Sequence, residues 1–507
     1  MRDKKISSAL ISVYYKEGLD EIVRALNDLK VKIYSTGGTY TFIKELGIDA
    51  EKVEDLTAYP SILGGRVKTL HPSVFGGILA RRSNLKDMEQ VQDYKIPEID
   101  LVIVDLYPFE ETVKSTSDED EIIEKIDIGG ISLIRAAAKN YNDVLVVSGR
   151  EQYPLLSSLL EVKKGISSLE ERRQFATEAF KVSSHYDTAI FKYFNKAAGI
   201  PVYRESINSS YPLRYGENPH QKGIFFGDPG LLFNKLHGKE ISYNNLLDIE
   251  AALCLIDEFK DPTVVIIKHN NACGVATRDT ITEAWKAALE CDPVSAFGGV
   301  IIANGDIDEI SAHEIDKIFF EIIISPGYSE QALEILGQKK NRIILQRKSS
   351  EKSYFSFRSL LNGVLWQERD NMTESVKDLK PVTPRIPDES ENRDLIFANI
   401  IVKHSKSNSI VLARNRQLYA SGIGQTSRVD ALRQAIDKAK SFGFDLKGAV
   451  MASDAYFPFA DSVEIAHKAG ITGIIQPGGS VRDKESIDYC SANDIAMVFT
   501  GIRHFKH

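Results

Sequence analysis

The stretch Thr263-Val-Val-Ile-Ile-Lys-His-Asn-Asn271 decides how this chain is interpreted. Its first five residues are β-branched, which favours a buried strand, and the strand runs directly into an amine, an imidazole and two amides. Proteins of the α/β class place their chemistry at such strand ends, because the sheet fixes the side chains and the crevice excludes water. A strand end can also be polar without any function. The two amides and the turn expected over 272–276 favour the functional interpretation.

Lys268 and His269 supply the chemistry at this strand end. The lysine offers a cation, and the histidine offers a group that titrates near neutral pH. Both are therefore candidate catalytic residues.

Length and composition indicate an ordinary multidomain globular protein. The chain has 507 residues, so roughly two to four domains are expected. Hydrophobic residues make up 43% and charged residues 26%. The net charge of -8 gives no global basic field for nucleic acid, so an anionic substrate needs local clusters of Lys and Arg.

Several segment types are not expected in this sequence. No apolar run reaches the roughly 18 residues of a membrane span, and the N-terminus leads into a strand rather than a signal peptide. The four cysteines have no CxxC spacing, and no zinc-binding pattern is present. Reduced thiols in a cytoplasmic protein without a metal are the simplest interpretation.

The first 150 residues alternate strand and helix patterns, which predicts a parallel sheet with both faces covered. Strands are expected at 9–13, 31–34, 101–104 and 144–147, and helices at 19–29 and 40–46. A helical stretch then extends to about residue 196, and Gly199-Ile-Pro201 has the composition of a linker. We therefore assign one domain to residues 1–197 and a second to residues 198–507.

The second domain is again α/β in pattern. Strands are expected at 263–267, 299–303, 410–413, 449–452, 473–476 and 496–499, with a helix at 282–290. The charged stretch 338–395 is expected to be loop-like. A weak similarity between 264–276 and 449–461 is insufficient to establish a repeat.

Ser35-Thr-Gly-Gly-Thr39 joins a predicted strand to a predicted helix. Glycines let the backbone approach a phosphate, and the hydroxyls and the N–H groups of the helix start donate to it. Ser12 and Lys16 follow the first strand and belong to the same edge of the sheet. A simple helix cap is the alternative.

Leu63-Gly-Gly-Arg-Val-Lys-Thr-Leu-His-Pro72 is a basic loop in an acidic protein. Arg66, Lys68, Thr69 and His71 lie within six residues and favour an anion, although a solvated basic loop would look the same.

Tyr107 follows the strand at 101–104 and could donate to a developing oxyanion, or could merely cap the core. Asp127 precedes a Gly pair at the expected start of a short helix, and Lys139 lies at the end of the same helix. Both are candidate site residues, although Asp127 could simply cap the helix.

The second domain has a comparable density of polar turns near strand ends. Phe297, in the turn Asp292–Gly299, could stack on a heterocycle or cover the core. The other candidates are Arg214 and Tyr215 in a polar loop, Asn408, Arg428, Tyr456, Phe459 and, near the end of the chain, Arg503.

Taken together, these strings resemble one family. In order, they are STGGT, LGGRVKTLHP, LYPF, IDIGG, RAAAKN, LRYGENPHQ, KHNNACGVA, DPVSAFGG, GQTSR, SDAYFPF and the C-terminal RHFKH. The chain is similar over essentially its whole length to the bifunctional purine-biosynthesis family that combines AICAR transformylase with IMP cyclohydrolase. The resemblance implies an N-terminal methylglyoxal-synthase-like α/β domain for the cyclohydrolase. It also implies a transformylase of two related, cytidine-deaminase-like α/β subdomains without zinc.

The resemblance implies site residues position by position. In the cyclohydrolase, the reacting groups would be met by Lys68, Tyr107, Asp127 and Lys139, and the nucleotide by Ser12, Lys16, Ser35, Thr36, Gly37, Gly38, Arg66 and Thr69. In the transformylase, catalysis would use Lys268 and His269 with Asn408 beside the imidazole. AICAR would bind Arg214, Tyr215, Arg428 and Arg503, and the AICAR and folate region would be lined by Phe297, Tyr456, Phe459 and Asp461.

The resemblance also implies partners. The co-substrate would be 10-formyltetrahydrofolate, the nucleotides would be AICAR, FAICAR and IMP, and the protein would be a homodimer with shared transformylase sites. No catalytic metal is implied, and a structural monovalent cation is possible. A nucleotide-sensing regulator and a methylglyoxal synthase are the alternatives. The first does not explain the 300 further residues, and the second expects an Asp pair near Tyr14 and Tyr15.

The chain departs from the family pattern at three places. The family usually reads Ser-Val-Ser-Asp-Lys-Thr-Gly where this chain reads Ser12-Val-Tyr-Tyr-Lys-Glu-Gly18. The family often has Asn at the position of Asp105, where a carboxylate should repel a nucleotide unless a Lys neutralises it. Tyr456 stands where Phe is frequent. These changes bring the geometry of the nucleotide edge into question rather than the chemistry.

Overall fold

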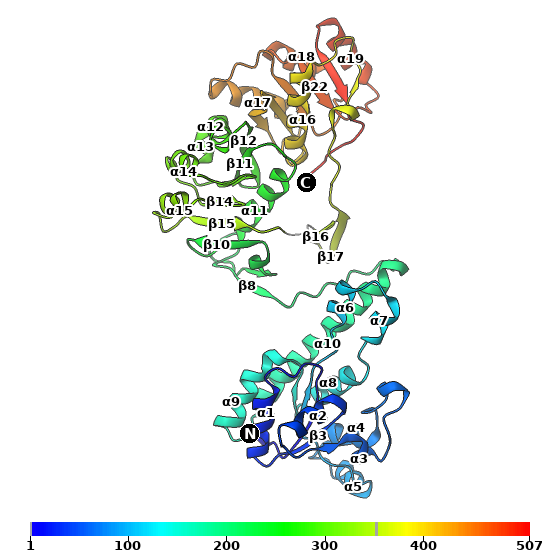
Figure 1. Ribbon diagram of the computed structural model, residues 1–507. Helices are drawn as coiled ribbons and strands as arrows, with labels where there is room; N and C mark the ends of the chain where they lie inside the picture. Colours follow the sequence, from blue (N-terminus) through cyan, green and yellow to red (C-terminus); the bar gives the residue numbers. More distant parts are fainter. Residues whose placement is uncertain (1–2, 350–352) are drawn as a thin grey trace. The chain divides into compact units, whose positions relative to one another are not determined.

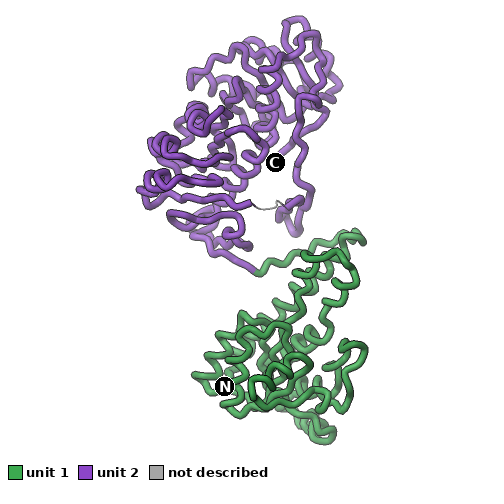
Figure 2. Tube along the Cα trace, in the orientation of Figure 1, with its two compact units in different colours: residues 1–208 green, residues 209–507 purple. Residues whose placement is uncertain are grey.

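The computed structural model describes residues 3–349 and 353–507, and the chain divides into two compact units. One unit ends at Asn208 and the other begins at Ser209 (Figure 2). The domain boundary expected between residues 197 and 198 falls at the end of helix α10 (Leu169–Ala198). Within the described ranges, no helix is both long and apolar enough to cross a membrane.

The first unit is built on a five-stranded parallel sheet in the order β4-β3-β2-β5-β6. Figure 1 labels β3 of this sheet and the helices of the unit. The strands are β2 (Ser8–Ser12), β3 (Lys32–Ser35), β4 (Glu51–Lys52), β5 (Leu101–Val104) and β6 (Leu145–Val147). The remaining helices are α1 (Leu19–Asp28), α2 (Gly37–Glu45), α3 (Val53–Thr57), α4 (Pro72–Leu79), α5 (Leu85–Asp93), α6 (Phe109–Ser115), α7 (Glu119–Glu124), α8 (Gly129–Lys139) and α9 (Tyr153–Val162). A short pair, β1 (Lys4–Lys5) and β7 (Ile166–Ser167), is antiparallel. The predicted parallel α/β sheet is confirmed.

Side chains on both faces of this sheet are buried. Ile11 and Ile103 pack with α1 and α9, whereas Leu10 and Val102 pack on the opposite face with α4, α8 and α10. Since successive side chains of a strand point to opposite faces, a sheet covered on both sides requires continuous apolar runs. That requirement explains why these strands could be recognised in the sequence.

The second unit contains a 12-stranded sheet in the order β10-β15-β14-β13-β11-β12-β20-β19-β21-β22-β23-β18. Its first half comprises β10 (Phe233–His237), α11 (Tyr243–Ile256), β11 (Thr263–Lys268), β12 (Asn271–Thr277), α12 (Ile281–Cys291), α13 (Pro293–Ala296), β13 (Val300–Ala303), α14 (Glu309–Asp316), β14 (Ile322–Ser325), α15 (Glu330–Leu336) and β15 (Ile343–Arg347). Its second half comprises β18 (Lys380–Pro381), α16 (Glu389–Lys403), β19 (Ile410–Arg414), β20 (Gln417–Gly422), α17 (Arg428–Ser441), β21 (Val450–Ser453), α18 (Asp461–Ala469), β22 (Gly473–Gln476), α19 (Asp483–Ala492) and β23 (Ala496–Phe499).

The two halves repeat the same topology. Each has an antiparallel hairpin, β11–β12 or β19–β20, followed by three further strands, and each ends in an antiparallel edge strand, β10 or β18. The halves meet where β12 pairs antiparallel with β20 at Ala276 and Gln417. The likeness of each half to cytidine deaminase remains a prediction.

Three expectations for the second unit are wrong. Residues 272–276 form strand β12 rather than a turn, because the chain reverses earlier, at His269 and Asn270, which both have positive φ. The counterpart of 264–276 is 410–422, not 449–461, since apolar runs ending in polar tips recur at several strand ends.

The third concerns the stretch 338–395, which is not a loop throughout. It holds the hairpin β16 (Phe355–Leu360) and β17 (Gly363–Glu368), and the start of α16. Residues 350–352 of that stretch lie outside the described residues.

Two glycines allow helices to lie against the hairpin strands. A Cβ on Gly274 of β12 would lie 2.2 Å from the carbonyl oxygen of Ala288 in α12, and one on Gly422 of β20 would lie 1.8 Å from that of Ala431 in α17. Backbone atoms cannot yield as flexible side chains do, so both contacts require glycine.

Gly274→Ala is therefore expected to lower the free energy of unfolding of the second unit by about 1–3 kcal/mol, as overpacking does elsewhere. Gly363→Ala in β17 is the matched control, because no atom lies within 4 Å of its added Cβ. Urea unfolding followed by tryptophan fluorescence measures both variants, because Trp285 is buried in α12 whereas the second tryptophan, Trp366, is already exposed. Equal stability of the two would contradict the close approach.

Candidate active sites

The carboxyl ends of β2 and β3 bring the first predicted nucleotide residues together. The Ser12 and Thr36 hydroxyl oxygens lie 3.1 Å apart, and Ser35 donates a hydrogen bond to the Ile11 carbonyl at 2.8 Å. Gly37 and Gly38 then open helix α2. Hydroxyls and the N–H groups of the helix start therefore meet at one edge of the sheet, as expected for a phosphate site.

Lys68 and Thr69 come to the same edge from the loop before α4. The Lys68 Nζ lies 3.7 Å from where a Cβ on Gly37 would stand, and Lys68 also covers Gly65. Thr69 is buried, and its hydroxyl lies 3.2 Å from the Cβ position of Gly129, the first residue of α8. A side chain at Gly65 would displace Lys68, and one at Gly129 would crowd Thr69, so these two glycines leave room for the basic cradle formed by Ser12, Thr36, Lys68 and Thr69.

Asp127 and Tyr107 lie at the start of α8 and at the end of β5. The Asp127 carboxylate accepts a hydrogen bond from the Gly130 N–H at 2.6 Å, and the Asp127 N–H donates to the Tyr186 hydroxyl at 2.9 Å. Burial raises the pKa of the Asp127 carboxyl, although N–H donors oppose the rise. Burial, and then the charge of Asp127, raise the pKa of Tyr107. The pair therefore couples a carboxyl that holds its proton more firmly to a phenol that stays neutral.

The departures at Asp105, Tyr14 and Tyr15 form one local structure. The Asp105 carboxylate accepts hydrogen bonds from the N–H groups of Tyr14 and Tyr15, the second at 3.1 Å. Burial raises the pKa of Asp105, while these donors and the charge of Lys16 oppose the rise. The carboxylate therefore fixes the loop after β2, and its charge is met by donors of that loop.

The aromatic rings of this loop contact residues of neighbouring segments. The Tyr14 ring packs edge-on against Tyr107 at 5.6 Å between centroids. Tyr15 donates a hydrogen bond to Glu111 at 2.9 Å and lies under Arg150. Lys16 turns back, with its Nζ donating to the carbonyls of Val13 and Tyr14.

Two predicted residues of the first unit lie apart from this cradle. Arg66 is exposed and forms an ion pair with Glu124. Lys139 is exposed at the far end of α8, so a helix of about 15 Å separates it from the start of α8 beside Asp127. One chain in this conformation does not bring Lys139 to Asp127, and its role remains a prediction.

In the second unit, Lys268 and His269 occupy the tip of the β11–β12 hairpin. The Lys268 Nζ donates to the Phe297 carbonyl, which ties the tip to the turn Asp292–Gly299. The Phe297 ring is 59% exposed and contacts Phe319 at 5.4 Å between centroids. The tip therefore presents an amine, an imidazole and an aromatic face together.

Arg214 and Tyr215 form their own pair in the loop before β9 (Ile224–Phe226), which pairs with β8 (Ser210–Pro212). The guanidinium of Arg214 lies 4.7 Å from the centre of the Tyr215 ring and donates to the Tyr215 hydroxyl at 2.8 Å. Arg214 also contributes its charge to the environment of Glu321. Glu321 lies directly before β14.

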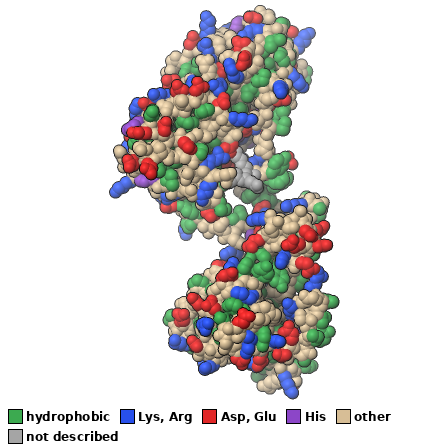
Figure 3. Space-filling view, in the orientation of Figure 1, with side chains coloured by type: hydrophobic (Ala, Val, Ile, Leu, Met, Phe, Trp, Pro, Cys, Tyr) green, Lys and Arg blue, Asp and Glu red, His purple; other side chains and the backbone are tan. Residues whose placement is uncertain are grey.

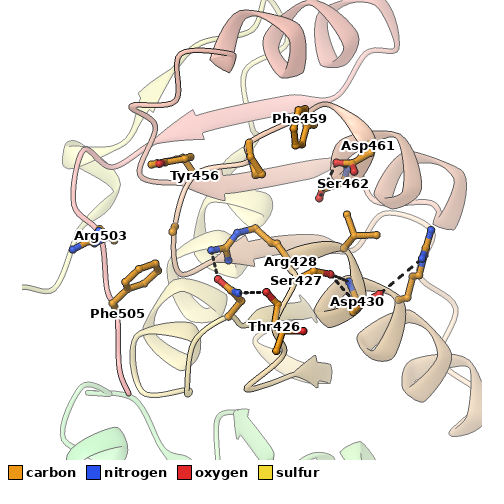
Figure 4. A pocket seen from close by; sticks show the side chains of 15 residues that line it. Thr426, Ser427, Arg428, Asp430, Tyr456, Phe459, Asp461, Ser462, Arg503 and Phe505 are labelled. Atoms are coloured by element: carbon orange, nitrogen blue, oxygen red, sulfur yellow. Dashed lines mark hydrogen bonds and ion pairs between the residues drawn. The ribbon is translucent and has the colours of Figure 1, made fainter.

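A cavity of about 640 Å³ collects most of the other predicted transformylase residues (Figure 4). Arg428, at the start of α17, donates to the Asn408 side-chain oxygen at 2.9 Å and forms an ion pair with Asp454. The predicted residues that line this cavity are Asn408, Arg428, Tyr456, Phe459, Asp461 and Arg503. Lys268 and His269 are not in its lining.

Sheet topology explains why the hairpin tip and the cavity stay separate. Lys268 ends β11, and Asn408 precedes β19 at the same edge of the sheet, with β12 and β20 between them. Three strand spacings amount to about 14 Å. The predicted contact between Asn408 and the imidazole is therefore not made within one chain.

The C-terminal segment is held by a buried histidine, His504, which lies in the RHFKH string but is not among the predicted site residues. His504 is 2% exposed, and its two ring nitrogens lie 2.6 Å from Asp370 Oδ2 and 2.9 Å from Glu374 Oε1. Burial opposes the imidazolium, but hydrogen bonds with Asp370 and Glu374 outweigh it and raise the pKa of His504 to about 9. This anchor fixes the neighbouring Arg503 at the cavity.

The chain thus joins a parallel α/β unit that carries the basic cradle to a larger unit with repeated hairpins and a basic, aromatic cavity. These features define a two-domain α/β enzyme. The model of the MGS-like domain matches residues 18–132, and that of the AICARFT/IMPCHase bienzyme matches residues 137–438. The chain belongs to the AICARFT/IMPCHase bienzyme family.

Full-length relatives agree with this assignment. A protein of Bacteroides thetaiotaomicron named bifunctional purine biosynthesis protein PurH is 64% identical over 505 residues, which cover 99% of each chain. A protein of the same name from Acetivibrio thermocellus is 47% identical over 517 residues, covering 99% of this chain and 100% of the relative. The family resemblance of the sequence is confirmed.

The raised pKa of His504 predicts a pH-dependent stability. Its contribution should be fully present below about pH 6.5 and lost as pH rises through about 9, and it amounts to about 3 kcal/mol at most. Urea unfolding of the wild type and of His504→Gln between pH 6.5 and 9 measures it. The wild type should lose stability over this range more steeply than the variant. Parallel pH profiles would contradict a charged, anchored His504.

Proposed function

We propose that the chain performs both reactions of its family, with formyl transfer in the second unit and ring closure in the first. A formyl group passes from 10-formyltetrahydrofolate to the 5-amino group of AICAR, and the resulting FAICAR loses water to give IMP. Family membership over both units is the observation that carries the two activities. A nucleotide-sensing regulator does not account for a match that spans the second unit.

Formyl transfer needs a base, because the lone pair of the 5-amino group is delocalised into the imidazole ring and is weakly nucleophilic. We assign that base to His269, which takes the amine proton as the bond to the formyl carbon forms. Asn408 is assigned to orient the imidazole. Lys268 is assigned to stabilise the tetrahedral oxyanion and to give a proton to the leaving folate nitrogen.

Substrate binding is assigned to the cationic and aromatic groups around these two regions. Arg214, Tyr215, Arg428 and Arg503 would hold AICAR, because guanidinium groups suit its phosphate. The exposed rings of Phe297, Tyr456 and Phe459 offer faces for the heterocycles, with Asp461 at the edge of the cavity.

Ring closure joins two groups of one molecule, so much of the catalysis consists of holding the reactive rotamer. The carboxamide nitrogen attacks the formyl carbon, and the carbinol oxygen leaves as water. Lys68 and Tyr107 are assigned to stabilise the oxyanion, and Asp127 and Lys139 to move protons. The raised pKa of Asp127 supports a proton-carrying role, because a carboxyl that titrates nearer neutrality exchanges protons more readily.

Nucleotide binding in the first unit is assigned to a separate set of residues, namely Ser12, Lys16, Ser35, Thr36, Gly37, Gly38, Arg66 and Thr69.

We further propose a homodimer with transformylase sites shared between chains. The separation of His269 from Asn408 within one chain supports this, since a second chain can supply the missing half. The β16–β17 hairpin supports it too, because it exposes large apolar side chains, including Leu365 and Trp366, in a surface otherwise mixed in charge (Figure 3). A second copy is the occupant that would cover them.

The setting and the ion are further proposals. We place the protein in the cytoplasm, because its four cysteines lack the spacing typical of disulfides or metal sites. Its net charge of -8 disfavours nucleic acid as a partner. A structural monovalent cation would require oxygen ligands. The Ser407 hydroxyl and the Asp454 carboxylate supply such atoms, and the buried Ser409 hydroxyl has no hydrogen-bond partner among the described residues. No step of the chemistry above depends on the ion.

His269→Ala is expected to reduce formyl transfer by at least about 10²-fold, the scale of a lost general base, while cyclisation of supplied FAICAR stays intact. Lys68→Ala should instead reduce the cyclisation of FAICAR and leave formyl transfer intact. Absorbance assays of each half-reaction measure both variants, and each is the control for the other. Normal formyl transfer in His269→Ala would refute the assignment.

Shared sites predict complementation between two inactive chains. His269→Ala and Arg428→Ala homodimers should each lack formyl transfer. After mixing through mild denaturation and refolding, about a quarter of wild-type activity should return, because half of the dimers are mixed and each restores one of two sites. No recovery, with mixed dimers demonstrated by mass spectrometry, would show that each chain builds its own site.

A further inference from the structure

Asp248 of helix α11 holds the turn that carries His269. Its carboxylate accepts a hydrogen bond from the Asn270 N–H at 2.6 Å. His269 and Asn270 have φ values of 51° and 62°, a left-handed conformation that residues other than glycine adopt infrequently, and two such residues in succession benefit from a bond that holds them. Burial raises the pKa of Asp248, whereas hydrogen bonds from the N–H groups of Asn270 and His269 oppose the rise. The bond therefore acts on the backbone of the candidate base.

The second repeat contains the same arrangement. Asp394 of α16 accepts hydrogen bonds from the N–H groups of Asn415 at 2.8 Å and Arg416 at 2.7 Å, and both of these residues have φ of 52°. Each aspartate stands five positions after the first residue of its helix, from 243 to 248 and from 389 to 394. The bond to the second turn residue spans 22 positions in both repeats. The carboxylate and its turn are thus equivalent parts of one repeated unit.

The two turns differ in what they carry and where they lie. The repeats meet through antiparallel β12 and β20, so the Asn415–Arg416 turn lies at the opposite edge of the sheet from Lys268. There, the Arg416 carbonyl accepts from the Thr277 N–H, and the Arg416 side chain pairs with Asp261. The Asn415–Arg416 turn therefore joins the two repeats, whereas the His269–Asn270 turn carries the exposed imidazole.

We propose that Asp248 is a positioning residue for formyl transfer, which fixes the left-handed His269–Asn270 turn and so sets the direction of the imidazole. The proposal rests on the function assigned to His269 above. The relevant property is a hydrogen-bond acceptor at a fixed place on α11. A base displaced by about 1 Å can lose about 10²-fold in rate, so a bond from outside the substrate site can control catalysis.

Variants of the full-length protein test this proposal. Asp248→Ala removes the acceptor, Asp248→Glu shifts it by one methylene, and Asp248→Asn keeps an oxygen in place without the charge. The kcat of formyl transfer should fall about 10- to 100-fold for the first two and stay within about fivefold of wild type for Asp248→Asn. The KM for AICAR should change little in all three, because binding is assigned to other residues. Cyclisation of FAICAR, which is assigned to the first unit, is the control for the amount of active protein, and urea unfolding of the second unit reports whether each variant is folded there.

Asp394→Ala is the matched control, since it breaks the equivalent bond at the other edge of the sheet. It should keep the kcat of formyl transfer while it lowers the free energy of unfolding about as much as Asp248→Ala. If Asp248→Ala is not recovered folded, Asp248→Glu compared with Asp248→Asn decides the question.

Wild-type kcat in Asp248→Glu, an equal loss in Asp394→Ala, or an Asp248→Asn variant as slow as Asp248→Glu would overturn the proposal. Full formyl transfer in His269→Ala would instead overturn the assigned function. The two failures are therefore distinguishable.

Discussion

The antiparallel pairing of β12 with β20 is the constraint on which the second unit depends. It joins two copies of one topology in opposite directions, so equivalent hairpin turns point to opposite edges of a continuous sheet. The His269 turn and the Asn408 segment then share one edge but stand about 14 Å apart. Strands that are hydrogen-bonded in one sheet and packed on both faces cannot slide past one another to close this gap. This separation supports the proposal that a second chain completes the formyl-transfer site.

The first unit follows a simpler constraint. Parallel strands bring Ser12, Thr36 and Asp105 to one edge, and glycines at 65 and 129 leave room there for Lys68 and Thr69. The departure at Asp105 shows that the surroundings of a carboxylate decide whether its charge can be accommodated near a nucleotide. A carboxylate facing a nucleotide would repel it, but this one accepts hydrogen bonds from two backbone N–H groups and lies in the field of Lys16. The chain therefore departs from the family pattern in the loop after β2, whereas the hydrogen-bond donors of the basic cradle are retained.

Much of the fold could be predicted, because strands covered on both faces must be continuously apolar. The strands at 473–476 and 496–499 were predicted to the residue for this reason. The reversal at His269 and Asn270 was missed, since this pair lacks the glycine typical of such turns. Its signal was present nevertheless, as an aspartate 21 to 22 positions before each turn in both repeats.

The candidate sites were less predictable than the strands. Motifs identified the groups, but the pairing of Arg66 with Glu124, the burial of His504 and the spacing of His269 from Asn408 depend on contacts between segments far apart in sequence. No local pattern encodes such distances. The family resemblance supplied the roles of Arg66, His269 and Asn408, and the topology shows which site residues one chain can bring together.

A structure of the protein with AICAR and an unreactive folate analogue tests the central claim most directly. The 5-amino nitrogen is expected to lie about 3 Å from the imidazole of His269 in one chain, while the Arg428 that holds the same AICAR belongs to the other chain. An AICAR molecule held by His269 and Arg428 of a single chain, or bound away from His269, would contradict it.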